Sequence, residues 1–233
     1  MPDIIMHVWD PKTQEATIDL ELPQNRLTIG VLNDSDYVDK VLLTPEAVAQ
    51  LVESGVAVLM ERGAGKGIYS DIDYANAGAD IMGVTAELLK NVNLVLKLSV
   101  LTTEQLQCLK PNTVVMSSVN LAQMSDDDLA IIQQNHLTLI ALDLLKDRHG
   151  HFVFATILHG DLYGKPAAMA LSTCLLPSLT AILSSKNIRY AIQTYPALLQ
   201  GVYCFQGIVC HHNMAERFQC PWKDILTLCW DWN

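Results

Sequence analysis

The chain has 233 residues, half of them hydrophobic, so it can bury a full core without support from disulfides or a metal. Its 15 Lys and Arg residues against 25 Asp and Glu residues give a net charge of -10, which argues against a nucleic-acid partner because phosphate binding needs a basic surface. Only 17% of the residues are charged and the mean hydropathy is +0.22, which predicts extra buried surface at a subunit interface.

The first residues, MPDIIMHVWDPK, contain two aspartates and no apolar core of a secretory signal, so a cytoplasmic protein is expected. Two β-rich stretches, 3–9 and 16–22, flank a turn-like segment and predict an N-terminal β-hairpin extension over residues 1–25. The remainder, 26–233, is predicted to be a single domain built from an N-terminal segment, 26–150, and a return segment, 151–233.

Strands and helices alternate through the N-terminal segment. Thr44 is predicted to cap a helix that has Pro45 at its first position and ends at Gly55, and Ser125 caps a helix with three aspartates in its first turn. The predicted strands are 26–32, 56–60, 79–82, 93–99, 113–116 and 137–142, and the predicted helices are 45–54, 73–77, 85–90, 102–109, 125–135 and 166–185. This alternation predicts an α/β fold with a doubly wound, mostly parallel open sheet of the flavodoxin-like or Rossmann-like kind.

Lys97 ends the apolar run Leu94–Leu96. A strand covered on both faces tolerates an ammonium group only where it emerges, and the carboxyl ends of parallel strands are where open α/β sheets bind ligands. Lys97 is therefore a candidate for binding a small anion. The alternative is a lysine that lays its stem over the sheet edge and keeps its ammonium in water.

Two other segments suggest a site or a membrane span. The loop 63–67 (GAGKG) lacks the spacing of a phosphate-binding loop, and positive backbone angles are enough to explain its glycines. Residues 166–185 carry no charge over 20 positions, the length of a membrane span, but Pro177 and six Ser and Thr residues favour a helix buried on most sides instead.

The six cysteines contain no CxxC pair and are expected to be free thiols. A cluster near the C-terminus could be drawn as a metal site, yet its spacing matches no structural zinc pattern, so we expect no metal; its members are Cys204, Cys210, His211 and His212. An enzyme with Cys210 as nucleophile beside His211 or His212 remains an alternative, and it requires one cysteine of lowered pKa.

Several stretches together resemble the N-terminal substrate domain of alanine dehydrogenase and of the related proton-translocating transhydrogenase alpha chain. They are VLLTP at 41–45, ERGAGKG at 61–67, SDIDY at 70–74, AGA at 77–79, LVLK at 94–97 and NLA at 120–122. The later stretches ALSTCLLP at 170–177, ALLQG at 197–201, FQG at 205–207, MAERF at 214–218 and PW at 221–222 resemble the return segment of that family.

The resemblance implies a Rossmann nucleotide domain between the two segments, whereas here they join near 152–165 and no dinucleotide fingerprint is present. No NAD or other cofactor is therefore expected, because the pyrophosphate has no helix N-terminus to bind. The resemblance places the carboxylate-binding lysine at Lys97. It places the family's arginine at Lys40, whose ammonium lacks the planar guanidinium that binds a carboxylate with two hydrogen bonds. It places the catalytic histidine at Asn120, whose amide cannot exchange a proton near neutral pH.

The first hypothesis is thus a catalytically inactive relative that binds a small carboxylate, a 2-oxo or amino acid, through Lys97, Lys40 and Asn120, or serves as an interaction module. The alternative is a subunit of a divided dehydrogenase or transhydrogenase whose Rossmann-domain partner is another protein. A homodimer is also expected, with the helix 166–185 at or beside the interface through small residues, because the resemblance implies that the missing nucleotide domain would uncover this helix. These small residues are Ala167, Ala168, Ala170, Ser172 and Thr173.

Overall fold

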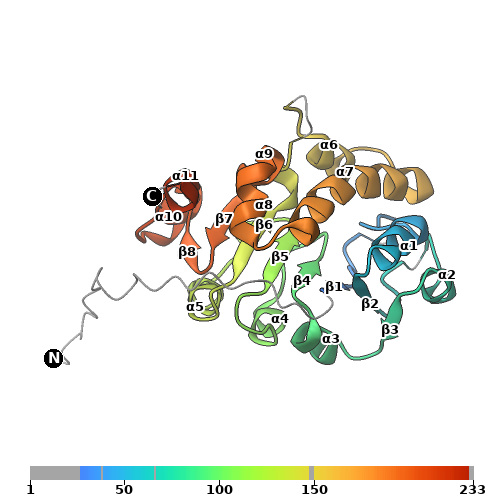
Figure 1. The fold of residues 1–233 in the computed structure, drawn as a ribbon. Helices are drawn as coiled ribbons and strands as arrows, with labels where there is room; N and C mark the ends of the chain where they lie inside the picture. The colour runs from blue at the N-terminus through green and yellow to red at the C-terminus, as the bar shows by residue number, and fades with distance from the viewer. Residues whose placement is uncertain (1–26, 38, 66, 147–149, 231–233) are drawn as a thin grey trace.

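The computed structural model describes residues 27–37, 39–65, 67–146 and 150–230 (Figure 1). The N-terminal hairpin predicted for 1–25 lies outside these residues. The strands are β1 Thr28–Val31, β2 Ala57–Glu61, β3 Asp80–Met82, β4 Leu94–Leu96, β5 Val114–Ser117, β6 Thr138–Ala141, β7 Val202–Phe205 and β8 Ile208–Val209. The helices are α1 Pro45–Glu53, α2 Asp71–Asn76, α3 Thr85–Asn91, α4 Thr103–Gln107, α5 Asp126–Gln134, α6 Val153–His159, α7 Gly164–Ser184, α8 Ile188–Thr194, α9 Pro196–Leu199, α10 His212–Phe218 and α11 Ile225–Trp230, with a 3-10 turn η2 at Leu142–Leu144.

The described strands form one sheet in the order β3-β2-β1-β4-β5-β6-β7-β8. The first six are parallel, and β7 and β8 are added antiparallel at one edge. The chain therefore winds outward in both directions from the β1–β4 pair. This confirms the predicted doubly wound, mostly parallel open sheet, and the return segment contributes its two antiparallel strands.

Local capping signals explain why the helices begin where they do. The Thr44 side chain accepts a hydrogen bond from the Ala47 amide, with Pro45 at the first helical position of α1. Ser125 and Asp128 exchange side-chain and backbone bonds in a capping box at the start of α5. Both predicted helix starts are confirmed.

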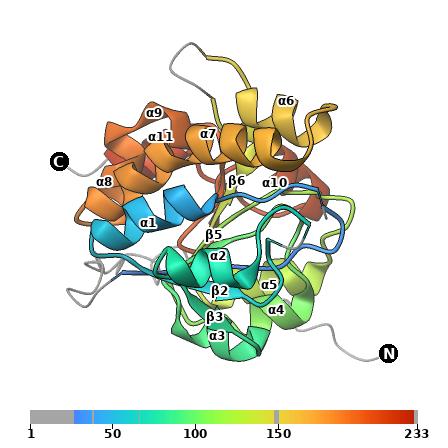
Figure 2. The same ribbon diagram turned by 90° about the vertical axis from the view of Figure 1, so that its right-hand side faces the viewer.

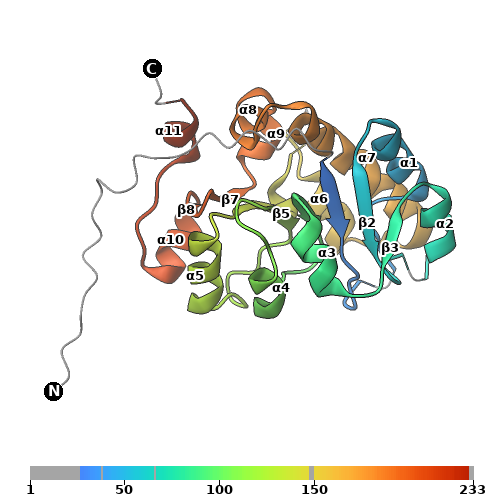
Figure 3. The ribbon, with the colours of Figure 1, turned by 60° about the horizontal axis from the view of Figure 1, so that its bottom comes forward.

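Helices cover both faces of the sheet (Figures 1 and 3). One face is packed by α1, α2 and the return-segment helices α6–α9 and α11, and the other by α3, α4, α5 and α10. Two separate hydrophobic clusters result, one on each side of the strands. Side chains of the central strands alternate between them, so that Val95 belongs to one cluster and Leu96 to the other.

By length and composition alone, helix α7 could cross a membrane, since it contains an 18-residue window with a mean hydropathy of 1.6. However, 44% of that window is buried inside the fold. Leu171, Leu175 and Leu179 are fully buried in the core. The Ser172 hydroxyl lies 2.8 Å from the Thr44 amide that donates to it and 3.1 Å from the Leu42 carbonyl that accepts from it. One side of α7 is therefore part of the core of its own chain.

The small residues predicted to contact a second helix are divided by this packing. Ala167, Ala168 and Ser172 are buried inside the chain, whereas Thr173 is exposed and Ala170 is half-buried. The predicted contact surface on α7 was therefore wrong in part, because its inner half covers the sheet.

The glycines of the loop after β2 serve two different purposes. Gly63 and Gly67 have positive φ angles of 77° and 94°, as predicted for this loop. Gly65 does not, but a Cβ atom there would lie 2.4 Å from Cε2 of the fully buried Tyr74. Gly65 is therefore required by close packing rather than by its backbone angle.

Candidate functional site

Lys97 follows β4 directly, at the carboxyl end of the β1–β4 pair. Because the strand order reverses between these two strands, this is the point where open α/β sheets bind ligands. The Lys97 side chain is only 7% exposed, and its Nζ donates to the Val100 carbonyl at 2.9 Å and to Oε1 of Gln105 at 3.1 Å. An ammonium has three donors, so these two bonds leave one for a ligand.

Lys40 is also 7% exposed, but it is bound to the return segment. Its Nζ donates to the carbonyls of Leu158 at 2.7 Å and Gly160 at 3.2 Å, and it lies 4.9 Å from the centroid of the Tyr163 ring. Lysine side chains commonly bind the last carbonyls of a helix in this way. Lys40 therefore caps the C-terminal end of α6.

The two lysines are held on opposite faces of the sheet. The acceptors of Lys97 belong to the α4 side, and those of Lys40 belong to the α6 side. A small cavity of ≈ 10 Å³ lies beside Lys40, at the carboxyl end of β1, and holds about one water molecule. The structure does not bring the two ammonium groups together on one open ligand site.

Asn120 lies in the turn that follows β5 and is exposed. The side-chain Oδ1 of Asn120 accepts a hydrogen bond from the Ala122 amide at 3.1 Å, and its backbone carbonyl accepts from the amides of Gln123 and Met124. Such bonds are typical of an asparagine that stabilises a turn. The side-chain oxygen of Asn120 is therefore used within its own turn.

Sequence reasoning missed Asp34, a carboxylate that is 8% exposed just beyond β1. Its Oδ2 accepts from the Ser99 amide at 2.5 Å and its Oδ1 from the Asp36 amide at 3.3 Å. Asp34 thereby links the segment after β1 to the segment after β4, where its partner Ser99 lies two residues beyond Lys97. The signal in the sequence was an acidic residue three positions after the end of a buried strand.

Ser118, which follows β5, was also missed. Its hydroxyl oxygen is buried and has no hydrogen-bond partner among the described residues. It lines a cavity of ≈ 20 Å³ together with Val100, whose carbonyl holds Lys97, and with the buried Asp128. A buried hydroxyl without a partner is costly, which points to a water or a polar ligand at this position.

The cysteine and histidine cluster does not form a nucleophilic site. Burial raises the pKa of the Cys210 thiol to about 12 and that of the Cys229 thiol to about 11, and it also raises the pKa of Cys204. The Cys210 thiol donates to the Ile208 carbonyl, while the His211 ring stacks on Tyr203 at 4.2 Å. In the described part of the chain, no three His, Cys, Asp or Glu side chains are grouped to hold a metal ion.

Thiol labelling tests this reading of the cysteines. At pH 7.5 a thiol of pKa 12 is ionised in fewer than about one molecule in ten thousand, and only the thiolate reacts. We expect iodoacetamide to leave Cys204, Cys210 and Cys229 unmodified in the folded protein and to label all three in urea, as measured by mass spectrometry of peptides. A single rapidly labelled cysteine among these three would contradict the burial described above.

The sequence profile of the family described as alanine dehydrogenase/PNT, N-terminal domain, matches residues 37–156, just over half of the chain. An alanine dehydrogenase of Staphylococcus saprophyticus is 38% identical over 85 residues, which cover 36% of this chain and 23% of the relative. Alanine dehydrogenase 2 of Staphylococcus aureus is 31% identical over 102 residues, which cover 43% of this chain and 27% of the relative. The matches thus span about a quarter of these curated relatives.

Among solved structures, an L-alanine dehydrogenase superimposes with a TM-score of 0.69 over 83% of this chain and 99% of that chain. The sequence identity is 13%, so this likeness shows the fold alone. The family profile covers just over half of the chain, and the chain therefore belongs to the family of proteins with an alanine dehydrogenase/PNT N-terminal domain.

Proposed function

We propose that this chain binds a small carboxylate, a 2-oxo acid or an amino acid, and does not transfer hydride by itself. The observation that carries the proposal is the position of Lys97, a nearly buried ammonium with one free donor where the strand order reverses. The oxygens of a carboxylate accept strongly from such a donor, and a carboxylate is the ligand that the family resemblance implies.

Ser118 supplies the second part of the proposed site. Its unpartnered hydroxyl follows β5, the strand next to β4, and the cavity that it lines includes Val100. A cavity of ≈ 20 Å³ holds a water but no three-carbon acid, so binding requires the loop around Val100 to move outward. Lys40 and Asn120 are not part of the proposed site, because Lys40 is bound to the carbonyls at the end of α6 on the other face of the sheet and Asn120 bonds within its own turn.

Two features support the absence of independent catalysis. Asn120 carries an amide that cannot serve as an acid or base near neutral pH. Between η2 and α7 the described residues form only the short helix α6, with no dinucleotide-binding fold inserted there. The cofactor would have no place on this part of the chain, which favours a binding domain over a complete dehydrogenase.

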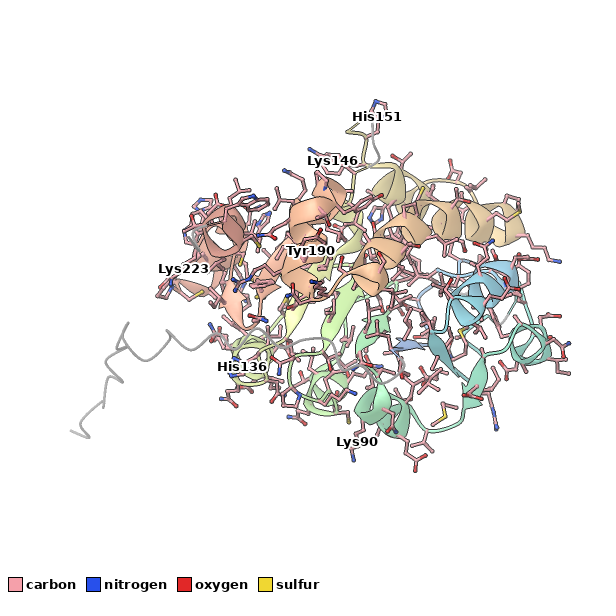
Figure 4. The ribbon with its side chains drawn as sticks, in the orientation of Figure 1. Lys90, His136, Lys146, His151, Tyr190 and Lys223 are labelled. Carbon is pink, nitrogen blue, oxygen red and sulfur yellow. The ribbon has the colours of Figure 1, made fainter. Side chains whose placement is uncertain are left out.

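Calorimetry with pyruvate and L-alanine at millimolar concentration tests the proposal. We expect binding by the wild type and a loss of affinity of about 10-fold to 100-fold in Lys97→Met, because a hydrogen bond to a charged group contributes about 1.5–3 kcal/mol. Ser118→Ala should weaken binding less. Lys90→Met, at an exposed lysine on α3 that points away from the sheet, is the matched control (Figure 4).

No heat with either ligand, from a protein that melts cooperatively, would contradict the proposal. So would equal affinities for the wild type and Lys97→Met. In either case the chain would be an interaction module that has kept only the fold of its family.

The alternative function is a subunit of a divided dehydrogenase or transhydrogenase. It is favoured by the family relationship and by the exposed apolar side chains of Phe152 and Leu162 at either end of α6, the segment that joins the two halves. Size-exclusion chromatography after mixing with a candidate NAD-binding partner would show a shared peak.

A further inference from the structure

The cavity that Ser118 lines extends from the carboxyl edge of the sheet into the core. It lies between β5, β6 and the helices α4 and α5, which lie side by side in the lower part of Figure 2, on the face of the sheet opposite to α7. Val100 and Val119, which follow β4 and β5, are half-buried and form its outer wall, here called the entrance. The inner wall consists of buried apolar side chains: Leu101, Leu106, Val115, Met124, Ile132 and Leu139.

Lys97 is fixed at the rim of this cavity through both of its acceptors. Val100, whose carbonyl accepts from Nζ at 2.9 Å, lines the cavity directly. Gln105, whose Oε1 accepts from Nζ at 3.1 Å, is followed by Leu106 of the inner wall. A carboxylate bound by the remaining donor of Lys97 therefore places the rest of its molecule beside the entrance.

The carboxylate of Asp128 decides which end of such a ligand enters. Asp128 is 6% exposed and lines the cavity, where its oxygens accept from the Thr103 hydroxyl at 2.7 Å and from the Ser125 amide at 2.8 Å. A second carboxylate inside the cavity would be repelled, because like charges interact strongly where water is excluded. The carboxylate of the ligand therefore stays at Lys97, and an uncharged group enters.

We propose that the ligand at Lys97 is a 2-oxo or 2-amino acid with an aliphatic side chain of two to four carbons, and that this side chain occupies the cavity. The inference rests on the carboxylate binding proposed above and names the class of acid. Pockets with apolar walls favour apolar groups, and a few polar atoms fix their orientation. Here that polar atom is the Ser118 hydroxyl, which can donate to a 2-oxo group or accept from a 2-ammonium group.

The volume of the cavity limits the size of the side chain. The space of ≈ 20 Å³ holds about one water molecule, which is also about the size of a methyl group. The end of a short aliphatic chain fits there once the loop around Val100 moves outward, with its other carbons at the entrance. An aromatic ring would displace several buried side chains of the inner wall, which is costly in a close-packed interior.

Calorimetry with two matched pairs of acids tests the inference: pyruvate against 4-methyl-2-oxopentanoate, and L-alanine against L-leucine. Each added buried carbon tightens binding about fourfold, so the three added carbons should give a preference of about 50-fold in at least one pair. Phenylpyruvate should bind no more tightly than pyruvate. Val119→Phe fills the entrance and should remove most of the preference, whereas the matched control Val84→Phe, at a side chain 50% exposed just before α3, should keep it.

Nuclear magnetic resonance of methyl-labelled methionine locates the side chain of the ligand. Met124 is 4% exposed and lines the cavity, so its methyl group should show nuclear Overhauser contacts to the methyl groups of the bound branched acid. Met169, 60% exposed on α7, should show none.

The possible failures are distinguishable. Equal affinities within both pairs, a preference that persists in Val119→Phe, or the absence of contacts from Met124 would each overturn the inference and leave the carboxylate site at Lys97 in place. If none of the four acids bound, the proposed function would be overturned together with this inference.

Discussion

Replacing Leu175 with alanine is expected to lower the free energy of unfolding by about 2–5 kcal/mol, the range found when a large buried side chain leaves a cavity. Leu175 is fully buried on the inner side of α7, in the cluster that this helix forms with the sheet and with α1. The tightly fixed position of α7, bonded to the 42–44 segment through Ser172, limits how far the site can collapse. The cost should therefore lie in the upper half of that range.

Urea unfolding followed by circular dichroism measures this effect. Met169→Ala is the matched control on the same helix, and under conditions where the protein is monomeric it should change stability by no more than about 0.5 kcal/mol because the side chain is 60% exposed. If Leu175→Ala and Met169→Ala shifted the urea midpoint equally, α7 could not be packed with this side inward.

Replacing Asp34 with alanine should cost about 1.5–3 kcal/mol and also weaken ligand binding at Lys97. The carboxylate accepts the Ser99 amide and the Asp36 amide, and its loss leaves the Ser99 N–H near the sheet edge without its acceptor. Because Ser99 is two residues beyond Lys97, the loop that carries the Lys97 acceptor Val100 should lose its fixed position. Asp34 is thus a positioning residue.

Three measurements separate this role from a general loss of stability. Asp36→Ala, at an exposed aspartate, should leave the unfolding midpoint and the affinity unchanged. Asp34→Asn keeps an acceptor oxygen and should recover part of both. Amide hydrogen exchange at Ser99 should accelerate in Asp34→Ala, and unchanged exchange there would refute the positioning role.

Local signals predicted the regular elements well. Thr44 with Pro45, and Ser125 with Asp128, mark helix starts through bonds within one turn of the chain, so the sequence contains all the information needed. The apolar run Leu94–Leu96 likewise identified a buried central strand. The short hairpin of β7 and β8 was not predicted, although Gln206 and Gly207 both adopt positive φ, as a tight hairpin turn requires.

The sequence by itself determined the alternating strands and helices of the N-terminal segment, the mostly parallel sheet and the emergence of Lys97 at its carboxyl edge, because these follow from apolar runs and caps of a few residues. The tertiary structure alone decided where the side chains of Lys97 and Lys40 are bound and which side of α7 faces the core. The acceptors of Lys40 are 118 and 120 residues away in the chain, and Asp34 reaches Ser99 across 65 positions. Helix α7 carries no charge after Lys165 and has Ser or Thr residues on both its buried and its exposed sides, so its sequence shows no preferred inner face until the 42–44 segment and the sheet are packed against it.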